Sequence, residues 1–275
     1  MSHPPRREVE LVDNDGTAFG IKHIGNKPRV SSMPYLYDIA EGNIADHAAF
    51  RILGYNSDVG TSEEDLWAVS GAYAFPAAAQ QMEVVSSAAA DDGAPVGTGA
   101  QTVMIHYLDE TYTEQEETVT LNGTTPVPTT AENILRVNDF HTVAVGTGGV
   151  AAGNIDIREL DDSPVYRRIP IGGNTTLDGF WTVPLGKTAF IVSWSVGSAG
   201  GNKDARFLLK TTSSLAGVLT AGIFQNKDIA IVEDGALQLP FFIPVKVPAT
   251  ADIKISVVSA ANSAICSGHV EGWYE

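Results

Sequence analysis

The chain has 275 residues, of which 44% are apolar and 18% are charged, and its formal net charge at pH 7 is −16. This composition is typical of a folded globular protein and excludes a disordered chain, and the length allows one or two domains. Cys266 is the only cysteine, which excludes an internal disulfide framework and a cysteine-based zinc cluster.

The sequence also argues against membrane and nucleic-acid functions. The N-terminus lacks the apolar stretch of a secretory signal, and no segment approaches the roughly 18 uninterrupted apolar residues of a membrane-spanning helix. Residues 52–158 contain 2 Lys and Arg against 15 Asp and Glu, a net charge of −13 within the total of −16. Because a surface this negative repels phosphates, we expect no direct contact with nucleic acid and no association with a membrane.

Residues 1–50 are predicted to form an extended N-terminal arm. Prolines interrupt the segment at Pro4, Pro5, Pro28 and Pro34, and its apolar residues follow no sustained period. Such a segment has little apolar surface to bury by itself. Two interpretations stay open, a poorly ordered tail and an arm that becomes ordered against a neighbouring subunit.

Residues 51–159 are predicted to form an acidic β-sandwich module. Short stretches of β-branched and apolar residues are separated by Gly, Asn, Asp or Pro, which is the pattern of strands joined by turns. Asn122-Gly123 is a hairpin signal, and the one candidate helix, residues 76–82, is brief. The predicted strands cover residues 102–108, 117–121, 134–137, 141–145 and 154–158.

Residues 160–275 are predicted to form a second β-sandwich, of jelly-roll or immunoglobulin type, which follows a linker at residues 160–170. Together with the preceding segments, this predicts an all-β fold class with two β-sandwich modules preceded by the arm. The predicted strands of this module cover residues 180–183, 188–196, 205–210, 237–243, 253–257 and 264–273.

Two of the six histidines, His106 and His141, lie in predicted strands of the middle module and are able to meet in space. No two histidines, however, stand at a metal-ligand spacing such as i and i+4 of a helix. A structural or solvent-facing role is the simpler interpretation. We therefore predict no metal site, no catalytic residue and no cofactor-binding site, and a protein that is not an enzyme.

Acidic and glycine-rich loops match known ligand sites only in part. Residues 13–16 begin like a calcium loop but lack the later acidic ligand, which leaves a turn. A weak calcium site at residues 63–65 or 91–92 stays open as an alternative. Residues 146–153 lack the Gly-Lys-Ser/Thr ending of a phosphate-binding loop and are predicted to be a flexible strand connection.

Cys266 and His269 are three positions apart in one predicted strand. Because successive side chains of a strand point to opposite faces, these two do not form a nucleophile pair. Cys266 is predicted to be a small core residue.

Aromatic residues near loops leave a carbohydrate-binding role open. Trp181 and Trp194 are assigned to the sandwich cores, where large aromatic side chains are commonly buried. The remaining candidates for stacking on sugar rings are Tyr55, Trp67, Tyr73, Tyr112 and Trp273.

Two motifs resemble segments of virion structural proteins of tailed bacteriophages, marine phages in particular. The first runs from Gly54 to Trp67 and contains a Gly-Tyr-Asn start, a Gly-Thr-Ser element and the tryptophan. The second, Trp-Thr-Val-Pro-Leu-Gly-Lys-Thr-Ala, covers residues 181–189. Residues 118–123 and 146–155 are similar to the segments that lie between these motifs, so the resemblance extends over residues 52–273.

The resemblance implies a non-enzymatic part of the virion, assembled in the host cytoplasm. We expect a capsid decoration or cement protein, or a minor head protein, that binds the major capsid protein or other virion proteins and stabilises the capsid lattice. A homo-oligomer, with a trimer favoured, fits a flat sandwich that packs around a symmetry axis. The alternative is a tail or fibre protein with a receptor-binding or carbohydrate-binding role, and a β-sandwich hydrolase is the remaining class.

Overall fold

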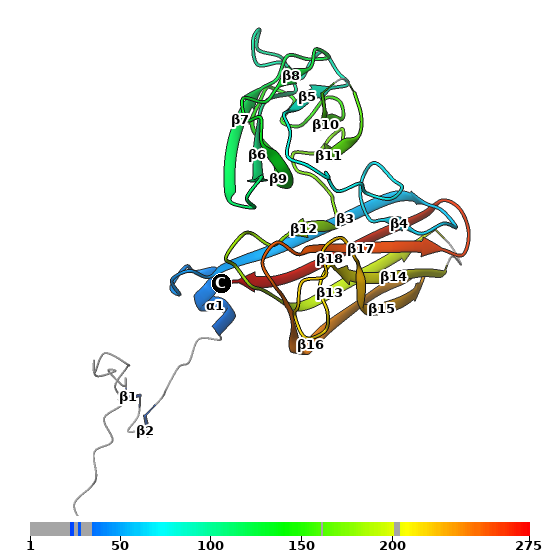
Figure 1. Cartoon of the computed structure of the whole chain (residues 1–275). Coiled ribbons are helices and arrows are strands. Elements are labelled where there is room, and N and C mark those ends of the chain that lie inside the picture. The colour runs from blue at the N-terminus through cyan, green and yellow to red at the C-terminus, as the bar shows by residue number, and fades with distance from the viewer. Residues whose placement is uncertain (1–22, 25–26, 29–34, 161, 201–203) are drawn as a thin grey trace, which may run out of the picture. The chain divides into compact units, whose positions relative to one another are not determined.

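The computed structural model describes residues 23–24, 27–28, 35–160, 162–200 and 204–275 (Figure 1). The chain divides into two compact units, Met1–Ala45 and Asp46–Glu275. The first unit contains two-residue strands β1 (His23–Ile24) and β2 (Lys27–Pro28) and helix α1 (Tyr35–Ala40). Most of the predicted arm lies outside the described residues, so its role stays a prediction. No helix among the described residues has the length and apolar character needed to cross a bilayer.

The second unit consists of antiparallel strands, which confirms the predicted all-β class. The strands are β3 (Ala48–Val59), β4 (Glu64–Asp65), β5 (Met82–Ser86), β6 (Ala100–Asp109), β7 (Glu114–Thr120), β8 (Val127–Pro128), β9 (Ile134–Val145), β10 (Ile155–Glu159), β11 (Val165–Ile169), β12 (Phe180–Thr182), β13 (Ala189–Ala199), β14 (Asp204–Thr211), β15 (Gln225–Glu233), β16 (Gly235–Val247), β17 (Asp252–Ser259) and β18 (Ala264–Tyr274).

The C-terminal sandwich has two facing sheets. One has the strand order β16-β13-β18-β3, and the other has the order β12-β17-β14-β15, with β4 also paired to β17. Alternation along the strands sets the inner face: in β18, Ala264, Cys266 and Val270 are buried while their neighbours are more exposed. Trp194 of β13 is fully buried in the same apolar core, as predicted for this tryptophan.

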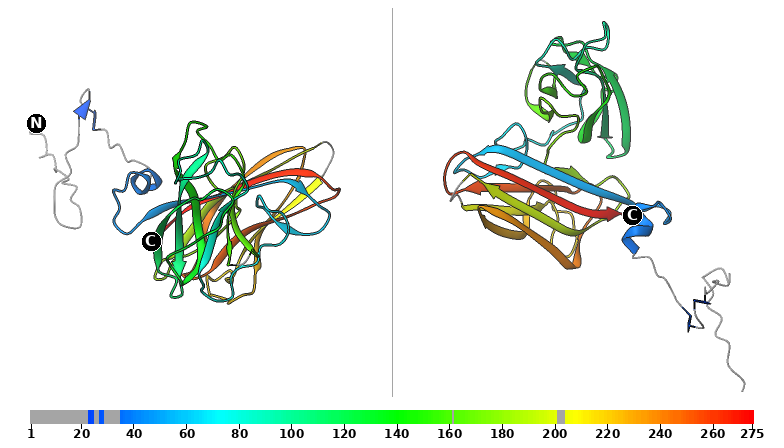
Figure 2. Two further views of the ribbon diagram at one scale, coloured as in Figure 1. Left: turned by 90° about the horizontal axis from the view of Figure 1, so that it is seen from above. Right: turned by 180° about the vertical axis from the view of Figure 1, so that it is seen from behind.

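Strand β3 belongs to the C-terminal sandwich. It pairs with β18 from Ala48 opposite Tyr274 to Val59 opposite Ala264, and the two strands run side by side in Figures 1 and 2. The boundary predicted between residues 50 and 51 therefore needs correction, because it assigned this strand partly to the arm and partly to the middle module. The pairing joins the two ends of the second unit, and no local sequence pattern predicts such a contact.

The middle sandwich is an insertion in the C-terminal one. Its sheets have the strand orders β11-β10-β5-β8 and β7-β6-β9, and they share an apolar core. All these strands lie in sequence between β4 and β12, and both β4 and β12 pair with β17 of the C-terminal sandwich. The second boundary also moves, because the predicted linker at residues 160–170 contains β11, which pairs with β10.

Local predictions within the sandwiches need smaller corrections. Gly123 does lie in a turn, but the turn is closed by a single bridge from Asn122 to Thr125 rather than by a hairpin of two long strands. Residues 76–82 form no helix, and β9 is one continuous strand where two were predicted. Strand β15, an edge strand of the C-terminal sandwich, was not predicted from the sequence.

Candidate functional site

The two histidines of the middle module do meet. His106 of β6 lies directly opposite Asp139 of β9, and His141 follows two residues later on the same face of β9. The two imidazole rings are stacked, with centroids 5.6 Å apart and an interplanar angle of 23°. The His141 Nδ1 atom is 2.6 Å from the Asp139 Oδ2 atom. The sequence predicted strands for both histidines. That Asp139 lies beside them follows only from the register of β6 and β9.

A polar seam joins the middle sandwich to the C-terminal sandwich, and two buried arginines cross it. Arg136 of β9 binds the carboxylate of Asp252, with Nε 3.0 Å from Oδ1, and its Nη1 donates to the carbonyl oxygen of Pro76 at 2.7 Å. The Asp252 carboxylate also accepts a 2.6 Å hydrogen bond from the Thr182 hydroxyl. Asn138 both donates to and accepts from the backbone of Thr182, as a paired strand would. These contacts fix the two sandwiches against each other.

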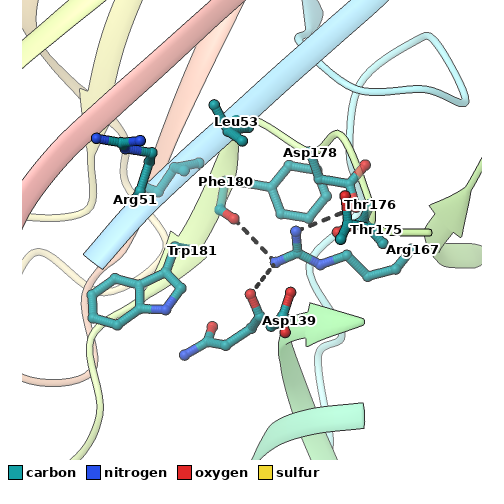
Figure 3. Close-up of a pocket in the computed structure, with 11 residues that line it drawn as sticks. Arg51, Leu53, Asp139, Arg167, Thr175, Thr176, Asp178, Phe180 and Trp181 are labelled. Atoms are coloured by element: carbon teal, nitrogen blue, oxygen red, sulfur yellow. Dashed lines mark hydrogen bonds and ion pairs between the residues drawn. The ribbon is translucent and has the colours of Figure 1, made fainter. Parts of the chain in front are cut away.

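The second arginine, Arg167 of β11, forms one wall of a pocket of about 180 Å³ (Figure 3). Its guanidinium donates to the carbonyl oxygens of Val137 and Phe180 at 2.6 and 3.0 Å, and it lies 4.2 Å from the centroid of the Phe180 ring. It also pairs with the buried carboxylate of Asp178 at 3.3 Å. The pocket is thus lined by a charge pair whose guanidinium already binds acceptors of the protein itself.

Asp178 is an unusual carboxylate. Burial raises its pKa to about 6, and the neighbouring Arg167 guanidinium opposes this shift without cancelling it. Its Oδ1 atom is buried and has no hydrogen-bond partner among the residues that the structure describes. Desolvation dominates because the side chain is fully enclosed and the ion pair is not bidentate.

The C-terminal sandwich exposes large apolar side chains at one side, where β15 and β16 form the open edges of the two sheets. The loop of residues 212–224 lies against β16, because a Cβ atom on Gly217 would lie 3.6 Å from the Lys246 side chain. Lys246 is the only charged residue in residues 212–224 and 235–247. We call this surface the apolar edge, and its exposed members are Leu215, Val218, Leu219, Ile223, Leu237, Phe242 and Ile243.

A bulge in β16 forms the most prominent part of the apolar edge. Pro240 faces Ser193 and Val245 faces Ile191, so the residues between Pro240 and Val245 leave the ladder with β13. Within the bulge, Phe242 is fully exposed and Ile243 is 78% exposed. Pro240 and Pro244 remove N–H donors from this edge strand, which hinders the addition of a further strand. A partner would therefore contact the bulge through side chains.

The acidic loops that left a calcium alternative open are engaged with donors of the protein itself. The Glu64 carboxylate accepts from the backbone N–H groups of Gly60 and Gly71, and Asp65 pairs with Lys254 at 2.9 Å. Asp91 is fully buried. Its carboxylate accepts four hydrogen bonds between 2.6 and 2.9 Å, from the Ser86 hydroxyl and the backbone of Ala100, Ala152 and Gly153. These carboxylates hold loops in place.

The glycine-rich segment at residues 146–153 is held by the protein and does not form a phosphate cradle. The backbone N–H groups of Gly146 and Gly148 donate to Gly99 and Thr98, and those of residues 152 and 153 donate to Asp91. A Cβ atom on Gly146 would lie 2.3 Å from the carbonyl oxygen of Gly97. The glycines therefore permit close packing of two loops, which is a tighter arrangement than the predicted flexible connection.

Cys266 and His269 point to opposite faces of β18, as predicted. Cys266 is buried in the core, and burial raises the pKa of its thiol to about 11. His269 instead lies across from Ser195 of β13, with Nδ1 2.7 Å from Oγ. This serine–histidine pair was not predicted from the sequence, because only the strand register places the two residues opposite each other. Both residues lie within paired strands, whose N–H groups are used in the ladder, so the described residues of these strands do not provide the pair with an oxyanion site.

The aromatic candidates for sugar stacking mostly pack on one another. Trp67 and Tyr73 are buried against Phe180 in the core of the middle sandwich. Trp273 stacks on Phe190, with ring centroids 5.1 Å apart. Trp181 is only partly buried and stacks on Phe50, with ring centroids 4.9 Å apart. Each of these rings thus already packs against another ring, and Tyr55 is a candidate that is exposed on β3.

Comparisons with known proteins do not assign this chain to a family. No family model and no curated protein matches it. Among solved structures, the PBSX exported protein XepA is similar at 11% identity and a TM-score of 0.18, covering 98% of this chain and 100% of that chain. A structure of infectious bursal disease virus, Gt strain, is similar at 9% identity and a TM-score of 0.20, covering 88% of this chain and 76% of that chain. TM-scores this low carry no argument about fold or function.

Proposed function

We propose that this chain is a non-enzymatic structural protein of a virion, a capsid decoration or minor head protein that acts as a homo-oligomer. The observation that carries the association is the apolar edge, with the exposed Phe242 and Ile243 on the bulge of β16. Exposed apolar patches of this kind on soluble proteins mark interaction surfaces. The virion assignment itself rests on the resemblance of residues 54–67 and 181–189 to phage virion proteins.

Charge supports a second copy of this chain as the partner at the apolar edge. Two copies that each carry a formal charge of −16 repel each other wherever their acidic surfaces meet. Within residues 212–224 and 235–247, which contain the exposed members of the apolar edge, Lys246 is the only charged residue, whereas residues 52–158 carry −13. Copies that meet at the apolar edge keep the acidic sandwich away from the contact.

We propose further that the C-terminal sandwich is a jelly roll. Counting β3 as the first strand, β4 and β12 as two halves of the second, and β13 to β18 as the third to eighth, the first strand pairs with the eighth. The second pairs with the seventh, the third with the sixth and the fourth with the fifth. Jelly rolls occur in viral capsids and in lectin domains, so this topology fits the proposal by analogy only.

The test of association is sedimentation velocity of the full chain beside a Phe242→Ser/Ile243→Ser double variant. We expect the wild type to form a discrete oligomer, and the variant to need at least about 30-fold more protein to form it, because buried aromatic anchors dominate interfaces. Leu185→Ser is the matched control, since Leu185 is exposed on the turn before β13. A monomeric wild type, or equal association of both variants, would contradict the role of the apolar edge.

The virion assignment is tested separately by cryo-electron microscopy of phage particles purified from cells that make the protein. Density for the two sandwiches on the head lattice supports the decoration role and reveals the copy number. Density confined to the tail or fibres would replace it with the receptor-binding alternative. Particles without the chain would remove the virion assignment and leave the association result standing.

A further inference from the structure

We propose that the outer face of the sheet β7-β6-β9 contains a binding site for a divalent transition-metal ion, with Zn²⁺ as the expected ion. The ligands are His106, Asp139 and His141, hereafter the histidine cluster. One potential ligand atom from each residue lies within 4.8 Å of the others. This site is independent of the apolar edge and of the proposed virion role.

The strand register gives the histidine cluster its geometry. Residues directly opposite in an antiparallel pair, and residues two apart in a strand, share a face. His106 is opposite Asp139, and His141 is opposite Met104, so both imidazoles and the carboxylate project from one small area of the sheet. The backbone of β6 and β9 is fixed by the ladder, which preorganises the three side chains without a dedicated loop.

Small side-chain rotations close the cluster around an ion. Zinc binds imidazole nitrogen and carboxylate oxygen at about 2.0–2.2 Å, so two ligands of one tetrahedral ion lie about 3.3 Å apart. The ligand atoms lie within 4.8 Å of one another, so no separation needs to shorten by more than roughly 1.5 Å. The side chains are free to move this far, because those of His106, Asp139 and His141 are 43%, 49% and 29% exposed.

The donor set indicates the class of metal. Two imidazoles with a carboxylate suit zinc and neighbouring transition metals, whereas calcium and magnesium prefer oxygen ligands alone. Strand β7 pairs with β6 on the side away from β9, and its Glu116 is directly opposite His106. The Glu116 Oε2 atom is 3.9 Å from His106 Nδ1, so Glu116 is placed to supply the fourth ligand. The −13 charge of residues 52–158 attracts cations to this surface.

A bound ion would link β6 to β9 and stabilise the middle sandwich. Any ligand that binds only the folded state raises stability in proportion to the logarithm of its concentration over its dissociation constant. The outer edge of β9 is hydrogen-bonded to residues 174–176. These residues precede Asp178, which pairs with Arg167 in the seam. Zinc would thus reinforce the part of the middle sandwich next to the C-terminal one.

The test is isothermal titration of the full chain with ZnCl₂, repeated for His106→Ala, His141→Ala and Asp139→Asn. We expect the wild type to bind zinc, with a loss of affinity of at least about 10-fold in each of the three variants. Glu116→Gln is expected to weaken binding less. His269→Ala is the matched control, because His269 also lies on an exposed strand face but bonds Ser195 instead of a carboxylate, and it should bind like the wild type.

Visible absorption of the Co²⁺-loaded chain provides a second readout at the same site. Ligand-field bands that are present in the wild type and the His269→Ala variant, and absent from His106→Ala, support the site. Circular dichroism of each variant shows that the loss comes from the ligand and not from unfolding. No zinc binding up to about 100 μM, a range in which even weak sites fill, would overturn the proposal. Wild-type affinity in both histidine variants would overturn it equally.

Discussion

The two sandwiches of the second unit share an architecture but are stabilised in different ways. The C-terminal sandwich has a continuous apolar core that includes Trp194, Phe207 and Ile255, and it leaves one apolar side exposed. The middle sandwich adds buried carboxylates to its apolar core, above all Asp91, and covers its outside with acidic residues. The difference teaches that the acidic sandwich presents a charged outside to solvent, whereas the C-terminal one leaves apolar side chains exposed, on which the proposed association depends.

The seam between the sandwiches combines both strategies. Arg136 and Arg167 come from the middle sandwich, and their carboxylate partners, Asp252 and Asp178, come from the C-terminal side. Because a buried charge must be paired, each ion pair specifies one way for the sandwiches to dock. An insertion with two connections and two such pairs is held more firmly than a domain on a single linker.

Asp91→Ala tests the polar strategy and should have the largest effect. The substitution removes one carboxylate and leaves three backbone N–H groups and a hydroxyl without their partner. Since bonds to a charged acceptor are worth about 1.5–3 kcal/mol each and compensation is partial, we expect a loss of about 3–5 kcal/mol in the free energy of unfolding. Urea denaturation measures the loss, and hydrogen exchange should locate it in the middle sandwich.

The neighbouring Asp92→Ala is the control for this prediction. The Asp92 side chain accepts one exposed hydrogen bond from the backbone of Ala94, so its loss should cost well under about 1 kcal/mol. Equal effects of the two substitutions would show that Asp91 does not organise the loops.

Gly54→Ala tests the packing of the C-terminal sandwich and should have the next largest effect. A Cβ atom at residue 54 would lie 2.6 Å from the carbonyl oxygen of Leu66 and 2.9 Å from the Cα atom of Gly179. Both neighbours are backbone atoms and cannot rotate away, so we expect a loss of about 2–4 kcal/mol, measured as a lower urea midpoint. Gly42→Ala, where nothing lies within 4 Å but φ is +72°, separates backbone strain from this clash.

Asp178→Asn tests the seam through its pH dependence, with the smallest expected effect. The folded-state pKa of Asp178 is raised to about 6 from an unfolded value near 3.8, so its contribution favours folding below about pH 4 and is lost as the pH rises through 6. Asparagine does not titrate. The stability of the variant relative to the wild type should therefore increase by about 1–3 kcal/mol between pH 4 and pH 7.5.

Glu271→Gln provides a control of opposite sign. Hydrogen bonds from Ser193 and Arg51 hold the pKa of Glu271 below its usual range, so its contribution is present at neutral pH and is lost on acidification. Urea denaturation across the same pH range should show the two variants diverging from the wild type in opposite directions. A flat pH response for Asp178→Asn would mean that the buried carboxylate is ionised at no cost.

The sequence by itself determined the all-β class, most strands of both sandwiches and the roles of Cys266 and Trp194. These features depend on local patterns, such as alternation along residues 264–274 and runs of β-branched residues, which need no knowledge of distant partners. The concentration of negative charge in residues 52–158 was also evident from the sequence. The apolar edge was not, because Phe242 looks like an ordinary core residue of an alternating strand until the bulge turns it outward.

Only the tertiary structure decided what depends on contacts between distant segments. It joined residues 48–59 to the C-terminal strands, made the middle sandwich an insertion and moved both predicted boundaries. It also aligned His106 with Asp139 and Arg136 with Asp252, pairs that are separated along the chain and have no common motif. Antiparallel pairing and burial choose such partners, and both are properties of the folded chain as a whole.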